Sequence, residues 1–160
     1  MILNIALFQL GWFACVLGAA NGYALEGALA AALIVALHIA RARQPKREAA
    51  LAVVAALLGV AFESLLVQAG WVRLEHGIYW LVALWALFAT TLNYSLRMLQ
   101  TRPWIAALVG AVGGPLAYYA GARMGALDFV QPAAMLAALA VGWALATPAL
   151  LSLARRLNVP

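Results

Sequence analysis

One acidic residue lies inside an apolar segment. Glu63 is the only charged side chain in LLGVAFESLLVQAG, residues 57–70. On insertion scales, a charged side chain at the centre of a bilayer costs about 2.5–3.5 kcal/mol. Carboxyl groups retained in such segments relay protons or contact ligands. The structural alternative is that Glu63 ties two helices together through a hydrogen bond worth about 0.6–2 kcal/mol.

Several polar and aromatic residues are expected at the same depth as Glu63. If each apolar run is a helix rising about 1.5 Å per residue, Glu63 lies slightly beyond the midpoint of its segment. Trp85, Tyr118, Tyr119 and Cys15 fall in the same half of the membrane. We therefore expect Glu63 to bond to a tyrosine hydroxyl, with the Trp85 N–H close by, and this cluster is the candidate ligand-binding or proton-coupling site.

Three residues nearer the middle or the inner half extend the candidate site. Gln9 and Trp12 share one helical face with Cys15, and Asn93 lies in the inner half at a depth that could reach Gln9 or Thr147. Such a polar and aromatic stripe lines a pocket in one interpretation. In the other it only packs helices together, because interhelical amide bonds are common in membranes.

Small residues recur at every fourth position of a later segment. They are Gly113, Ala117, Gly121 and Gly125. A row of this kind lets two helix backbones meet closely. It predicts a contact with another helix, which could belong to a second copy of the chain or to a membrane partner.

The same segment contains a candidate helix break. Gly113, Gly114 and Pro115 are consecutive, and a proline inside a helix removes one backbone donor and obstructs the preceding turn. A short unwound stretch would free carbonyl groups of the kind that line binding sites in transporters. A simple packing kink is the alternative.

Several kinds of chemistry have no matching residues. The single cysteine, Cys15, excludes an internal disulfide and a multi-thiolate metal site, and His38 and His76 are isolated from other ligands. No metal site, cofactor motif or phosphate-binding loop is expected. The net charge of +5 does not indicate nucleic acid, because the basic residues gather in loops between apolar runs.

Composition predicts the elements that position these residues. Hydrophobic residues make up 68% of the 160 residues and charged residues 9%, with a mean hydropathy of +0.98. Soluble domains usually have about 25% charged residues, so the excess apolar surface must face lipid. We predict a single all-α domain of six transmembrane helices, over residues 2–20, 23–40, 49–70, 78–99, 104–122 and 131–153.

Basic residues predict how the spans are oriented. Eight of the ten Lys and Arg residues fall on one side of the predicted spans and two, Arg73 and Arg123, on the other. The richer side should be cytoplasmic, so both termini are predicted there. Six spans also divide into three plus three, which would make the halves an inverted repeat as in many transporters.

Three segments together carry a resemblance. They are LFQLGWFACVLGAANG, LWALFATTLNYSL and GAVGGPLAYYAGARMGAL, and they resemble an uncharacterised bacterial inner-membrane family, the domain-of-unknown-function family numbered twenty-eight seventy-eight. The resemblance covers nearly the whole chain and implies a small polytopic protein of the bacterial inner membrane. The family's acidic position in the third span is usually aspartate, so Glu63 keeps the carboxyl group and adds one methylene. The resemblance brings no activity, substrate or cofactor.

Three functions are compatible with these residues. The preferred one is a small transporter-like or lipid-handling protein whose site around Glu63 binds a hydrophobic small molecule or a membrane lipid. The second is a membrane enzyme acting on a lipid or isoprenoid-like substrate, with Glu63 as general acid. The third is a non-catalytic subunit of a membrane complex. Enzymes usually bring several titratable groups together and only one buried carboxyl group is predicted, so we favour the first.

Overall fold

The computed structural model describes residues 2–158 and confirms an all-α chain of six α-helices. The helices are α1 (Ile2–Ala20), α2 (Ala24–Arg41), α3 (Pro45–Gln68), α4 (Tyr79–Ala89), α5 (Pro103–Arg123) and α6 (Pro132–Asn158). One 3-10 turn, η1 (Arg97–Leu99), and two short strands, β1 (Val72–Arg73) and β2 (Asp128–Phe129), lie between them. Five of the helices are long and apolar enough to cross a membrane, and α4 is shorter.

Local signals explain most helix boundaries. α3, α5 and α6 each begin with a proline, Pro45, Pro103 and Pro132, where the missing N–H would have no partner in any case. α1 and α5 are followed by Gly22 and Gly125, whose φ angles are +81° and +86°. Glycine adopts this left-handed conformation without strain and commonly ends a helix. Gly125 therefore terminates α5 and does not lie on its packing face.

The fourth helix ends ten residues before the predicted boundary of 99, at Ala89. The hydroxyls of Thr90 and Thr91 each donate to a backbone carbonyl three residues earlier, at 2.7 Å. The backbone N–H groups of both residues also donate to the carbonyl three residues earlier, instead of the one four residues earlier that an α-helix uses. Side-chain bonds of this kind compete with the regular α-helical ladder. The chain therefore leaves the α-helix at Thr90 and continues through turns to η1.

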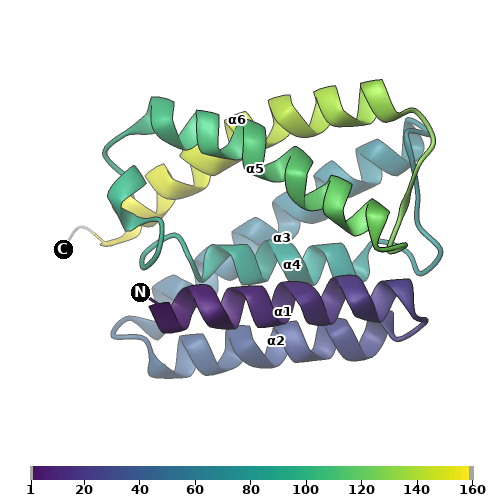
Figure 1. The fold of residues 1–160 in the computed structure, drawn as a ribbon. Helices are drawn as coiled ribbons and strands as arrows, with labels where there is room; N and C mark the ends of the chain where they lie inside the picture. Colours follow the sequence, from purple (N-terminus) through teal and green to yellow (C-terminus); the bar gives the residue numbers. More distant parts are fainter. Residues whose placement is uncertain (1, 159–160) are drawn as a thin grey trace.

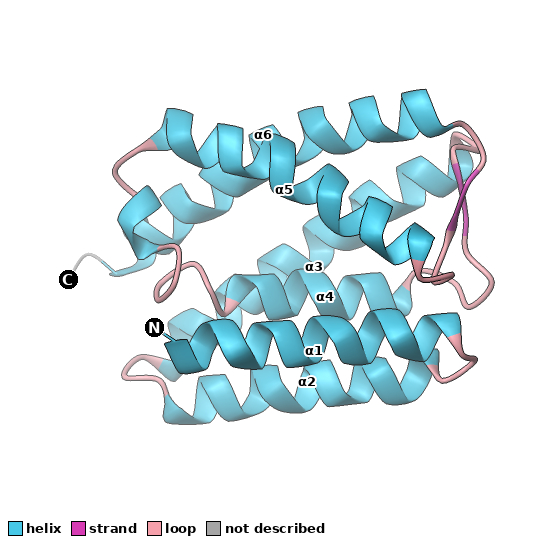
Figure 2. Cartoon of the chain, in the orientation of Figure 1, coloured by secondary structure: helices cyan, strands magenta, loops and turns pink. Residues whose placement is uncertain are grey.

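The helices pack in consecutive pairs, α1 with α2, α3 with α4 and α5 with α6. Helix α4 also contacts α1 and α2, so it lies inside the bundle, and α6 contacts α3. Figure 1 shows the α1–α2 pair and the α5–α6 pair on opposite sides of α3 and α4, with the start of α1 and the end of α6 at the same end of the molecule. At the other end, β1 and β2 pair antiparallel and join the α3–α4 loop to the α5–α6 loop (Figure 2).

A three-plus-three repeat is not evident. The first helices of the two halves differ in length, with 19 residues in α1 and 11 in α4. Helix α4 is also enclosed by its neighbours, whereas α1 exposes large apolar side chains along its length.

The outer surface is that of a membrane protein. Large apolar side chains on all five long helices have 60% or more of their area exposed, among them Leu10, Leu29, Leu57, Leu108 and Leu145. Contiguous apolar surface of this extent is rare on soluble monomers. The lipid-facing excess expected from composition is therefore present on the fold.

The expected helix break at Gly113, Gly114 and Pro115 is absent, because α5 runs through Pro115 without interruption. Packing against α6 explains its continuity. A Cβ atom on Gly114 would overlap the Trp143 ring, and one on Gly110 would overlap the Trp143 carbonyl oxygen. Helix α6 thus supports α5 in the turn before Pro115, and neighbouring helices are what make an internal proline tolerable in a membrane helix.

Candidate functional site

Glu63 lies at the meeting point of three helices. Its side chain, on α3, is fully buried. Trp85 of α4 donates its Nε1–H to Oε1 of Glu63 at 2.9 Å, and the Tyr118 hydroxyl of α5 donates to the same oxygen. The second oxygen, Oε2, is buried and has no hydrogen-bond partner within residues 2–158. One carboxyl oxygen therefore joins α3, α4 and α5, while the other keeps unused bonding capacity.

The Trp85 indole is held in place from several directions. It lies over Gly59, one helical turn before Glu63, where a Cβ atom would stand 2.5 Å from the ring carbon Cγ. It stacks on Trp143 with ring centroids 4.3 Å apart and an interplanar angle of 17°, and it meets Phe62 edge to face at 5.8 Å. Only glycine at position 59 leaves room for this arrangement, which keeps the indole N–H directed at Glu63.

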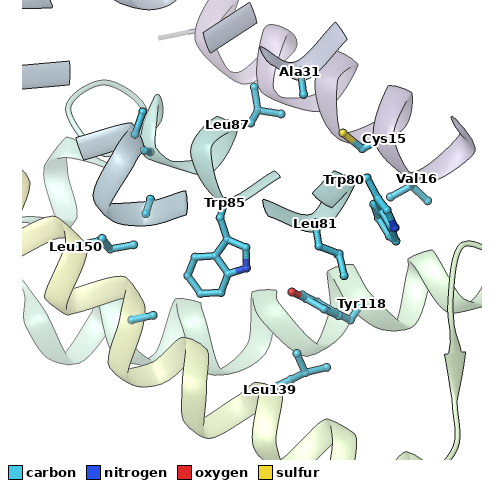
Figure 3. Packing of buried hydrophobic residues seen from close by; sticks show 14 of the residues in the cluster. Cys15, Val16, Ala31, Trp80, Leu81, Trp85, Leu87, Tyr118, Leu139 and Leu150 are labelled. Carbon is cyan, nitrogen blue, oxygen red and sulfur yellow. The ribbon is translucent and has the colours of Figure 1, made fainter. Parts of the chain in front are cut away.

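A cavity of about 70 Å³ adjoins this cluster. A single buried water needs roughly 10–15 Å³, so the cavity has room for several non-hydrogen atoms. Helices α1, α4, α5 and α6 contribute its lining, which is apolar and rich in rings. Figure 3 shows the Tyr118 hydroxyl directed toward the Trp85 indole, and Leu81 and Trp80 on the same side of the Trp85 ring as Tyr118. The aromatic residues of the lining include Trp12, Trp80, Trp85, Tyr118 and Trp143.

Helices α1 and α5 both border the cavity. The two helices are scarcely in contact with each other in the described part of the chain. Helix α4, which packs against α1, contributes more of the lining residues than any other helix.

Four of the predicted site residues lie together. Glu63, Trp85 and Tyr118 are in direct contact, and Trp12 lies on the wall of the same cavity. Their shared depth had been estimated from the sequence. Their role in binding or proton coupling stays a prediction.

Other residues expected near Glu63 lie elsewhere. Half of the Tyr119 side chain is exposed, on a different face of α5 from Tyr118, and Gln9 is exposed on α1. Cys15 is fully buried, but its thiol faces α2 and donates to the carbonyl oxygen of Gly27 at 3.4 Å.

Asn93 belongs to a second polar cluster. Its Nδ2 donates to Oε1 of Glu48 at 2.8 Å, and its Oδ1 accepts from Nε2 of Gln100 at 2.9 Å. The expected partners, Gln9 and Thr147, are not the ones that these bonds reach. The reason is the early end of α4, which turns Asn93 toward the start of α3.

The second cluster also contains a contact between a histidine and a carboxyl group that the sequence did not predict. Nε2 of His38 lies 3.2 Å from Oε2 of Glu48, and both side chains are nearly buried. The third span had been predicted to begin at residue 49, which assigned Glu48 to a loop. Pro45 was the available signal, because a proline at the first helical position places Glu48 in the first turn.

The predicted row of small residues is divided between different surroundings. Gly113 is exposed, and a Cβ atom there would meet nothing within 4 Å. Ala117 and Gly121 line the cavity, and Gly125 lies in the turn after α5. Contact with a partner through these residues stays a prediction, and Gly113 is the member that is open to one.

No group of three or more His, Cys, Asp or Glu side chains could hold a metal ion within the described residues.

A family model described as "Protein of unknown function (DUF2878)" matches residues 1–149. No curated protein and no solved structure matches the chain.

Proposed function

The chain belongs to the DUF2878 family, and we propose that it binds an apolar, lipid-like molecule in the cavity beside Glu63, in a transporter-like or lipid-handling role. One observation carries the proposal. Trp85 and Tyr118, whose rings line the cavity, are also the two donors to the buried carboxyl group.

The shared residues couple the cavity to the carboxyl group. A molecule in the cavity would press against the Trp85 and Tyr118 rings, because both belong to the lining. Any shift of either ring would change a hydrogen bond to Oε1 of Glu63. Binding would therefore alter the environment of Glu63, which is how proton uptake could be linked to movement of the ligand.

The site suits a molecule that arrives from the bilayer. The lining is apolar, and removing apolar surface from water gives about 25 cal/mol per Å². A ligand already dissolved in lipid gains less from this term, so selectivity would depend on ring contacts and on the few polar atoms present. Under these conditions, indole N–H groups in the lining can discriminate between ligands.

The same proposal includes a location and an orientation. We infer a bacterial inner-membrane protein with both termini in the cytoplasm, because eight of the ten Lys and Arg residues fall on the side of the termini and cytoplasmic loops are enriched in these residues. Fusions of a reporter that is active only in the cytoplasm, placed at each terminus, should both be active. Activity of a fusion in the α1–α2 turn would contradict the orientation.

A matched pair of variants tests ligand binding. Gly121 lines the cavity, and a Cβ atom there would reach its nearest neighbours only at 4.0 Å, so Gly121→Leu fits and fills the space. Gly113→Leu makes the same change on the same helix, at an open position. We expect a photoactivatable fatty acid to label peptides of the cavity wall at least several-fold more in the wild type than in Gly121→Leu. Labelling of Gly113→Leu should resemble that of the wild type.

The labelling sites are read by mass spectrometry of the full chain in lipid nanodiscs. Equal labelling of the cavity wall in the wild type and Gly121→Leu would mean that the fatty acid does not occupy the cavity. The proposal would then be wrong.

A further inference from the structure

A buried donor in the cavity wall has no acceptor. Trp80, at the start of α4, is 1% exposed and lines the cavity, and its Nε1 atom has no hydrogen-bond partner within residues 2–158. Buried polar groups are nearly always hydrogen-bonded, and each exception needs an explanation. A ligand that supplies an acceptor oxygen would satisfy this donor.

From this we infer that the cavity selects uncharged, flat molecules that carry hydrogen-bond-accepting oxygens, such as carbonyl-bearing ring compounds of the quinone type, with Trp80 Nε1–H as donor. The inference rests on the proposed function and names the ligand class of the same site.

The lining favours an uncharged ligand. None of the residues that line the cavity is charged, so a phosphate headgroup would have no counter-charge there. A cation would find a carboxyl group only behind the cavity wall, where Oε1 of Glu63 already holds Trp85 and Tyr118 as donors. An isolated charge in such a setting is strongly disfavoured.

The shape of the lining favours a ring. The cavity of about 70 Å³ is smaller than the roughly 150 Å³ that encloses benzene, so only the carbonyl-bearing edge of a ring system would enter it. Its walls are largely aromatic, with Trp85 and Trp143 stacked nearly parallel. Aromatic groups gain most from one another in offset-stacked or edge-to-face contact. A flat ring system can make such contacts, and a ring with carbonyl groups also offers the acceptor that Trp80 lacks.

Two probes of the same shape isolate the acceptor oxygens. We propose measuring the binding of 2,3-dimethyl-1,4-naphthoquinone and of 2,3-dimethylnaphthalene to the full chain in lipid nanodiscs by calorimetry. The second compound has the same two-ring frame and methyl groups without the carbonyl oxygens. One neutral hydrogen bond predicts about 3- to 10-fold tighter binding of the naphthoquinone.

A second matched pair assigns the preference to Trp80. Two lining residues, Trp80 and Trp143, have a buried indole N–H without a partner in the described residues. Trp80→Phe removes the one assigned here as the donor, and Trp12→Phe removes an indole N–H elsewhere in the same cavity. The preference for the naphthoquinone should disappear in Trp80→Phe and persist in Trp12→Phe. Should Trp80→Phe fail to fold, the comparison of the two probes on the wild type still decides the question.

Each outcome counts for or against the inference. Equal affinity for the two probes, with both lost in Gly121→Leu, would overturn the acceptor inference and leave the proposed function standing. Tighter binding of a naphthylmethyl trimethylammonium cation than of the naphthoquinone would overturn it in favour of a cationic ligand. Failure of both naphthalene probes to bind would also overturn it, whereas the fatty-acid labelling decides the proposed function separately.

Discussion

Removing the acceptor at Glu63 should destabilise the bundle far more than removing its acidity. Glu63→Leu leaves two donors, Trp85 Nε1 and the Tyr118 hydroxyl, without the oxygen that they share. All three side chains are buried, at 0%, 2% and 7% exposure respectively, so solvent cannot replace the acceptor. Glu63→Gln keeps a carbonyl oxygen that can occupy the position of Oε1.

The size of the effect follows from the two bonds. Hydrogen bonds between membrane helices average about 0.6 kcal/mol, with a maximum near 1.7, whereas an orphaned buried donor in soluble proteins costs about 1–3 kcal/mol. Two donors therefore predict a loss of roughly 1–6 kcal/mol in the free energy of unfolding for Glu63→Leu. Glu63→Gln should lose about 1 kcal/mol or less, because both donors keep an acceptor.

Cys15 offers a direct assay for this difference. It is the only cysteine in the chain, and its side chain is fully buried between α1 and α2. A thiol-reactive fluorophore should label it only when the bundle opens, and α4, which carries Trp85, packs against both of these helices. Labelling is followed during heating or SDS titration in detergent. Coincident unfolding of Glu63→Leu and Glu63→Gln would refute the view that Glu63 joins three helices as an acceptor.

Two further predictions concern packing and the second polar cluster. Gly110→Ala and Gly113→Ala gain the same helix propensity, about 1 kcal/mol, but only at Gly110 would the added Cβ overlap the Trp143 carbonyl. Overpacking of about 1–3 kcal/mol should lower the unfolding midpoint of Gly110→Ala below that of Gly113→Ala, and equal midpoints would contradict the close α5–α6 contact. Glu48→Leu removes the partner of His38 and one acceptor of Asn93, so the loop between α2 and α3 should become more sensitive to protease than in Glu48→Gln. Equal cleavage of the two variants would count against a structural role for the cluster.

Position along the helix axis was predictable from the sequence, and rotation about that axis was not. Tyr118 and Tyr119 have almost the same depth, and adjacent residues of a helix point about 100° apart. Counting residues therefore places both near Glu63, and only packing decides between them. Tyr118 is 7% exposed and bonds to Glu63, whereas Tyr119 is 50% exposed. The same limit applies to Gln9, which lies at a suitable depth on an exposed face.

The end of α4 separates two kinds of buried polar group. With 11 residues, α4 is about 16 Å long, too short for a hydrocarbon core of about 30 Å, and irregular backbone at that depth persists only where protein covers it. Amide side chains complete its hydrogen bonding, since Asn4 donates to the carbonyl of Thr90 and Gln100 to that of Leu92, both at 3.0 Å.

Those amides have a structural explanation that needs no ligand. Hydropathy could not reveal the early end of α4, because the few polar residues after Ala89 do not interrupt the apolar average of the predicted span. Glu63 and Trp80 differ, since each keeps a buried atom without a partner in the described part of the chain. Trp80 lines the cavity, and Glu63 is bonded to two residues that do. A ligand is therefore expected in the cavity, where bonding capacity is unused, and not at the end of α4, where amide side chains occupy the freed carbonyl groups.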